Sequence, residues 1–182
     1  SVFSPMNIVA AIGAYAALLR EQGLPLSFPG GGRYINGASD SRLIARVAEF
    51  AATNEIAANE TYNVVNGDAL VWQDIWGSIA AKFKMPVGEP APLCLADHMP
   101  QYEALWAQLV NKHDLASFTL SEIISSSWEF TDRALGYGAE NIADSVLSPI
   151  KLRQHGFANC YDTEDSLHDW LELMQKNRLI PR

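Results

Sequence analysis

The strongest constraint in this sequence is an apolar stripe that begins immediately after a tight turn. Residues 63–76 read NVVNGDALVWQDIW, which is a short apolar run, an Asn-Gly-Asp turn and a segment with two tryptophans four residues apart. Apolar side chains then recur at helical spacing, at Trp72, Ile75, Trp76, Ile79, Ala80 and Phe83. This spacing predicts a helix with one wide apolar face, which must be buried against other elements.

Strand, turn and helix in this order also make up a phosphate-binding loop, but these residues do not fit one. The chain lacks GxxxxGK[ST], and its triple glycine at 30–32 leads into no immediate helix. Asn66-Gly67-Asp68 has one glycine and places a carboxylate where a phosphate would bind. We therefore predict a crossover turn, preceded by a strand at Tyr62–Val65.

Capping residues and helical spacing predict that most of the chain is helical. Ser4 and Pro5 are expected to start a first helix, which Gly23 ends. A second helix is expected to start at Ser39 or Asp40 and to bury Leu43, Ile44, Val47 and Phe50.

The last third is predicted to be helical throughout. Thr119 and Glu122 form a capping box for a helix that runs through Trp128 toward Leu135. Further helices are expected at 102–110, at 149–154 and from Asp162 or Thr163 onward. With an extended piece at 24–28, the fold class is α/β, mostly helical with two or three short strands.

The proline-rich segment at about 85–98 is expected to be a surface linker within a single region, 1–182. It would join an α/β part (1–84) to a helical part (99–182). The chain starts with Ser1, and ordered structure is predicted to begin almost at once. We therefore expect a piece of a longer chain.

Charge and cysteine content indicate a cytoplasmic protein that binds neither nucleic acid nor membrane. The 182-residue chain has a net charge of −8, and its 13 basic residues are scattered. No apolar run approaches the roughly 20 residues that span a bilayer. Cys94 and Cys160 have no CxxC spacing and are expected to be reduced.

No catalytic, cofactor-binding or metal-ligating residue is assigned from the sequence. Cys94, Asp97 and His98 have zinc-like spacing, but nearby prolines oppose a helix there. His155 and Cys160 could form a nucleophile pair, yet His155 precedes Gly156 as at a helix end. None of the six tyrosines is followed by lysine four residues later, so the tyrosine–lysine dyad of short-chain oxidoreductases is missing.

The stretch NETYNVVNGDALVWQDIWGSIAAKF (59–83) resembles the C-terminal half of extended short-chain dehydrogenase/reductases, in particular the progesterone 5β-reductase/iridoid synthase-like group. Three further stretches resemble the same group in the same order along the chain. They are PMNIVAAIGAYAALLREQGLPLSFPG (5–30), ASDSRLIARVAEFAAT (38–53) and KLRQHGFANCYDTEDSLHDWL (151–171).

The resemblance implies the substrate-binding C-terminal part of an NAD(P)H-dependent reductase, without the Rossmann nucleotide-binding half. The parent enzyme would use NAD(P) to reduce an enone or carbonyl of a small apolar molecule. This fragment alone would be inactive and would bind no cofactor. By position, the resemblance assigns substrate contacts to Met6, Asn7, Trp128, Phe130, Leu147 and Ser148.

Two alternatives remain open at the level of the sequence. One is the C-terminal part of a nucleotide-sugar epimerase or dehydratase, although Arg33, Arg42 and Arg153 are widely scattered for a diphosphate site. The other is a non-enzymatic helical binding module.

The apolar first helix also predicts self-association through residues 5–28.

Overall fold

The computed structural model describes residues 4–182 and is mostly helical within that range. Its α-helices are α1 (Ile8–Glu21), α2 (Ser41–Thr53), α3 (Trp72–Lys82), α4 (Leu95–His98), α5 (Glu103–Lys112), α6 (Leu120–Ile124), α7 (Ser127–Ala134), α8 (Ile150–Gln154) and α9 (Thr163–Lys176). Two 3₁₀ turns, η1 (Glu55–Ala57) and η2 (Met99–Tyr102), complete the helical elements.

Extended backbone is reduced to isolated bridges in the described part of the chain. They pair Leu26 with Val87, Asn36 with Leu70, and Asn36 with Ser145. The predicted fold class is therefore confirmed in its helical character. The strand expected at Tyr62–Val65 is wrong, because these residues form no ladder with a neighbouring strand.

The chain divides into two compact units whose segments interleave along the sequence. Within the described residues, unit 1 comprises 4–32, 72–142 and 168–182, and unit 2 comprises 33–71 and 143–167. The sequence prediction instead divided the chain at 85–98. Within unit 1 this proline-rich segment lies beside 26–29, where the Leu26 N–H donates to the Pro86 carbonyl at 2.9 Å.

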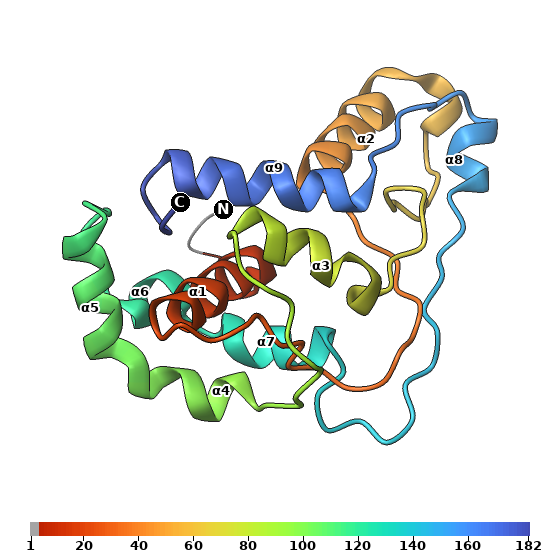
Figure 1. The fold of residues 1–182 in the computed structure, drawn as a ribbon. Helices are drawn as coiled ribbons and strands as arrows, with labels where there is room; N and C mark the ends of the chain where they lie inside the picture. Colours follow the sequence, from red (N-terminus) through yellow and green to blue (C-terminus); the bar gives the residue numbers. More distant parts are fainter. Residues whose placement is uncertain (1–3) are drawn as a thin grey trace. The chain divides into compact units, whose positions relative to one another are not determined.

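Unit 1 is built around α1, whose residues 10–18 are all buried. This helix contacts α5, α6 and α7 (Figure 1). Its small residues permit this close packing, and Gly13 lies directly against Ile180 and Leu171. The apolar surface of α1, which the sequence predicted to be buried by self-association, is thus buried by other helices of the same chain.

The apolar stripe at 72–83 forms α3 as predicted. Trp76 is buried, and its ring meets Phe28 edge-on with centroids 5.1 Å apart. The indole N–H of Trp76 donates to the Leu26 carbonyl at 3.3 Å, so the buried nitrogen keeps a partner.

Two of the three glycines at 30–32 are packed closely against backbone. Added side chains at Gly30 and Gly31 would collide with the carbonyl oxygens of Leu135 and Gly136. The Gly31 N–H donates to the Leu135 carbonyl at 2.9 Å. Glycine is required here because two backbone segments touch.

Unit 2 has a small core of its own. Leu43 and Val47 from α2 pack with Leu152 and Phe157, and partly buried residues surround them. Ile44 was predicted to belong to this face, but it is 49% exposed. It lies one residue, or about 100° of helical rotation, beyond Leu43, and so falls outside the buried stripe.

Two helix boundaries in unit 1 also differ from the prediction. The first helix begins at Ile8, because the Asn7 side chain accepts the Ala10 N–H at 3.1 Å and caps it. The predicted helix from Thr119 to Leu135 is broken at Ser125, which has a φ of 48°. The capping box of Thr119 and Glu122 is confirmed.

Replacing Trp76 with alanine is expected to lower the free energy of unfolding by about 3–5 kcal/mol, the usual result of emptying a buried aromatic site. Urea denaturation would measure the change. Trp76→Phe is the matched control, since it keeps a buried aromatic ring while losing the N–H donor and part of the ring volume, and its effect should be smaller. An unchanged midpoint for Trp76→Ala would contradict this packing.

Tyr15 generates a prediction for alkaline pH. Burial raises its pKa to about 12, and its hydroxyl donates to the Ser27 carbonyl at 3.1 Å. The folded-state pKa of Tyr15 lies above the unfolded value of about 10, so the folded state favours the protonated phenol. The contribution of the protonated Tyr15 to the free energy of unfolding is therefore complete below pH 10 and is lost as pH rises through about 12.

Tyr15→Phe should therefore unfold more easily than the parent chain near pH 8, but lose less stability between pH 10 and 12. Urea midpoints across this range would measure both effects. Tyr137→Phe, at an exposed tyrosine, serves as the control. Parallel pH profiles for the parent chain and Tyr15→Phe would refute the assignment.

Candidate functional site

Four of the six predicted substrate contacts lie in unit 1, where α1 and α7 begin. Asn7 caps α1, and its backbone N–H donates to the Ser127 hydroxyl at 3.1 Å. Since Trp128 follows Ser127 in α7, this hydrogen bond brings Asn7 and the start of the Trp128 segment together.

Their accessibility differs. Met6 is 63% exposed and Phe130 is half-buried, so both can be reached from solvent. Trp128 is buried. Of the apolar side chains predicted to contact substrate in unit 1, Met6 is therefore the most exposed.

The other two predicted contacts, Leu147 and Ser148, lie in unit 2. Leu147 is 49% exposed, and its neighbours Val146 and Ile150 are also exposed. The Ser148 carbonyl accepts from the Asn63 side-chain amide at 3.3 Å. This segment therefore presents apolar side chains from a backbone that is held to the rest of its unit.

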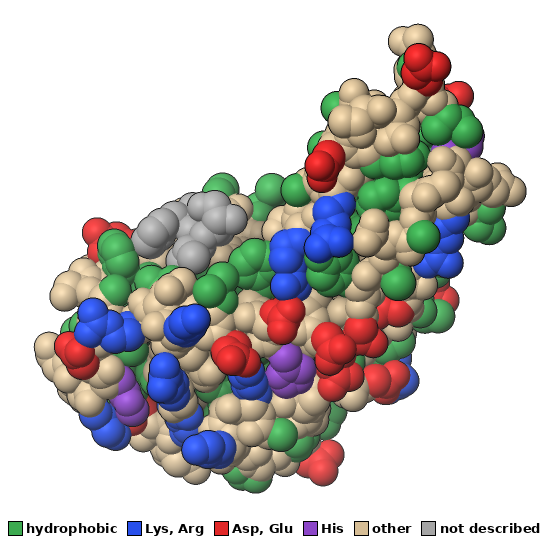
Figure 2. Space-filling model, turned by 90° about the horizontal axis from the view of Figure 1, so that it is seen from above, with side chains coloured by type: hydrophobic (Ala, Val, Ile, Leu, Met, Phe, Trp, Pro, Cys, Tyr) green, Lys and Arg blue, Asp and Glu red, His purple; other side chains and the backbone are tan. Residues whose placement is uncertain are grey.

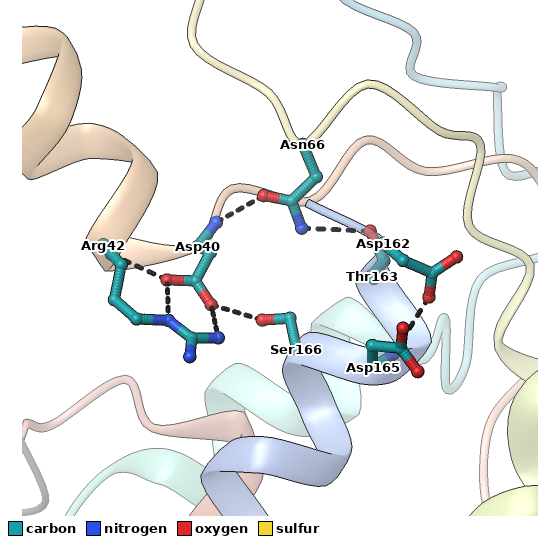
Figure 3. A network of polar contacts seen from close by, with 7 residues as sticks. All are labelled: Asp40, Arg42, Asn66, Asp162, Thr163, Asp165 and Ser166. Atoms are coloured by element: carbon teal, nitrogen blue, oxygen red, sulfur yellow. Dashed lines mark hydrogen bonds and ion pairs between the residues drawn. The ribbon is translucent and has the colours of Figure 1, made fainter. Parts of the chain in front are cut away.

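The Asn-Gly-Asp turn that precedes α3 anchors another helix of the chain (Figure 3). The Asn66 amide accepts the Asp40 N–H at 2.7 Å and donates to the Thr163 hydroxyl at 3.0 Å. Asp68 accepts both the Thr163 N–H, at 2.7 Å, and its hydroxyl, at 2.6 Å. The turn thus holds Thr163, the first residue of α9, while Asp162 caps the helix by accepting the Asp165 N–H at 2.9 Å. This structural role agrees with the one predicted for the turn from its sequence.

The same network engages a buried carboxylate and an arginine. The Asp40 side chain is fully buried, caps α2, and accepts from the Nε and a terminal nitrogen of Arg42 at 3.0 and 2.8 Å. The Ser166 hydroxyl also donates to it. Arg42 is therefore paired within the fold, which gives no support to the diphosphate site of a nucleotide-sugar enzyme.

Cys94 and His155 each have a polar partner within the fold, and Cys160 is at the surface. The Cys94 thiol donates to Asp132 at 3.5 Å, and burial together with this carboxylate raises the pKa of the thiol. His155 Nδ1 lies 2.7 Å from the Tyr62 hydroxyl, whereas Cys160 is exposed. Among residues 4–182, no group of three or more His, Cys, Asp or Glu could hold a metal ion.

The molecular surface has no single dominant charge on the face that Figure 2 shows, where acidic and basic side chains are interspersed. Unit 2 also carries an open groove of about 510 Å³, lined by Arg46, Glu49, Phe50, Thr53 and residues 156–159. Its mixed lining differs from an apolar substrate pocket. None of the helices between residues 4 and 182 has the length and hydropathy of a membrane span.

Known relatives cover this chain from end to end, although no protein-family model matches it. It is 31% identical over 188 residues to an (S)-8-oxocitronellyl enol synthase of Camptotheca acuminata, with 100% of this chain and 46% of the enzyme covered. A 3-oxo-Δ4,5-steroid 5β-reductase of Arabidopsis thaliana is 31% identical over 187 residues, with the same coverage. The chain thus spans about half the length of these relatives.

Asp68→Ala is expected to lower the free energy of unfolding by about 1–2 kcal/mol, because the N–H and the hydroxyl of Thr163 lose their carboxylate acceptor. Amide exchange at Thr163 should accelerate in the same variant. Asn159→Ala, at an exposed position of unit 2, is the control and should change neither quantity. Wild-type exchange at Thr163 in Asp68→Ala would show that this carboxylate contributes nothing.

Proposed function

We propose that this chain, a homologue of the progesterone 5β-reductase/iridoid synthase-like enzymes, is the substrate-binding C-terminal part of an NAD(P)H-dependent reductase. Its substrate would be a small apolar molecule with an enone or carbonyl group. The observation that carries this proposal is the similarity of the whole of this chain to about half of an (S)-8-oxocitronellyl enol synthase and of a 3-oxo-Δ4,5-steroid 5β-reductase.

The surface chemistry of the predicted contacts supports an apolar substrate. Met6 and Leu147 are exposed large apolar side chains on two segments with defined backbone hydrogen bonds. A thioether side chain adapts its shape to varied apolar ligands.

The hydride chemistry would be supplied by residues outside these 182 positions. The sequence contains neither a Gly-rich phosphate loop nor a tyrosine with lysine four residues on. Its one strand–turn–helix candidate presents Asp68, which is engaged with Thr163. This fragment is therefore expected to bind substrate weakly, to bind NADPH poorly and to be inactive by itself.

Tryptophan fluorescence and calorimetry on the purified chain test the proposal. A 3-oxo-Δ4,5-steroid should change the fluorescence saturably, whereas NADPH should give no micromolar binding heat. Met6→Asp and Leu147→Asp should weaken steroid binding at least several-fold, because each places a charge against an apolar ligand.

Asn159→Asp adds the same charge at an exposed residue of unit 2 that is not among the predicted contacts, and should leave steroid affinity unchanged. Equal affinity for all three variants would remove Met6 and Leu147 from the site. Absence of steroid binding by the parent chain, or micromolar NADPH binding, would contradict the proposal.

A further inference from the structure

The short segment before α1 forms a turn whose two ends meet one buried hydroxyl. Pro5 and Met6 form the centre of this turn, between Ser4 and Asn7. The Ser127 hydroxyl donates to the Ser4 carbonyl at 3.4 Å and accepts the Asn7 N–H at 3.1 Å. One side chain of α7 therefore closes the turn on which the exposed Met6 lies.

We infer that Ser127 is a positioning residue for substrate binding, because its hydroxyl fixes the turn that presents Met6. The inference rests on the proposed substrate site and adds a residue that has no substrate contact of its own. Ser127 is 0% exposed, so it acts through the turn.

The hydroxyl suits this role because it can donate and accept at once. An alanine at Ser127 would keep the backbone of α7 and leave both ends of the turn without this partner. The backbone N–H of Asn7 would lose the Ser127 hydroxyl as its acceptor. Losing an acceptor lowers stability more for a partly buried N–H than for one at the open surface. Within the turn, the Met6 N–H also donates to the Ser4 hydroxyl, at 3.5 Å.

The backbone just before Ser127 supports the same reading. Ser125 ends α6 with φ 48° and ψ −127°, a conformation that strongly favours glycine. This strained residue interrupts the helix predicted from Thr119 onward, and α7 then starts with Ser127 as its first residue. Strain of this kind persists where surrounding contacts hold it, and it is concentrated at functional segments.

The test is amide hydrogen exchange at Met6 and Asn7, together with steroid titration, for the parent chain and Ser127→Ala. Exchange at Asn7 should accelerate on the order of fivefold, the factor that one ordinary hydrogen bond provides. Steroid affinity should fall by a similar factor. Ser126→Ala removes the exposed neighbouring hydroxyl and should retain parent-like exchange and affinity.

Pro5→Gly loosens the turn without altering α7 and should weaken steroid binding in the same direction, so the inference stays testable if Ser127→Ala fails to fold. Unchanged Asn7 exchange and unchanged affinity in Ser127→Ala, or unchanged affinity in Pro5→Gly, would overturn the inference. If the parent chain binds no steroid, the proposed function fails, and the exchange measurement alone decides whether Ser127 holds the turn.

Discussion

Carboxylates that accept N–H groups at helix starts hold this structure together. Asp132 of α7 accepts from Leu95 and Ala96 at the start of α4, at 2.8 and 2.9 Å. Glu103 of α5 does the same for α6, and Asp68 does so for α9. With no extended ladder in residues 4–182 to align segments, these contacts fix the direction in which each helix leaves its neighbour.

Some of the carboxylates that make the chain acidic therefore stabilise helix starts. Each cap satisfies donors that a helix leaves unpaired, and a carboxylate there interacts favourably with the helix dipole. Glu122 accepts from the Thr119 N–H and hydroxyl, and these bonds lower the pKa of Glu122. A phosphate loop would need the same N–H groups free, so acidic capping and phosphate binding exclude each other at these helix starts.

Helix faces could be predicted from sequence because they depend on local spacing. Three features were predicted correctly from residue spacing and capping residues. They are the apolar stripe of α3, the capping box at Thr119 and the start of α2 after Asp40. The true cap of α1, Asn7, was missed because Ser4-Pro5 is also a good start signal. The break at Ser125 has no glycine or proline to mark it.

Long-range contacts were not predictable in the same way. Asp68 and Thr163 are 95 positions apart, and Asn7 and Ser127 are 120 apart, so no spacing rule relates them. The resemblance placed Asn7 and Trp128 in one site, and the fold brings their segments together through Ser127. Ser127 itself was missed because a serine within Ser125-Ser126-Ser127 carries no distinctive pattern.

The proposed role of this chain is to supply substrate binding to an NAD(P)H-dependent reductase. The most direct measurement places this chain in the Arabidopsis thaliana 3-oxo-Δ4,5-steroid 5β-reductase, in exchange for the part aligned with it. NADPH oxidation is then followed with a panel of small apolar enones. The account predicts enone-dependent turnover by the chimera; a folded chimera that binds NADPH and reduces none of the enones would contradict it.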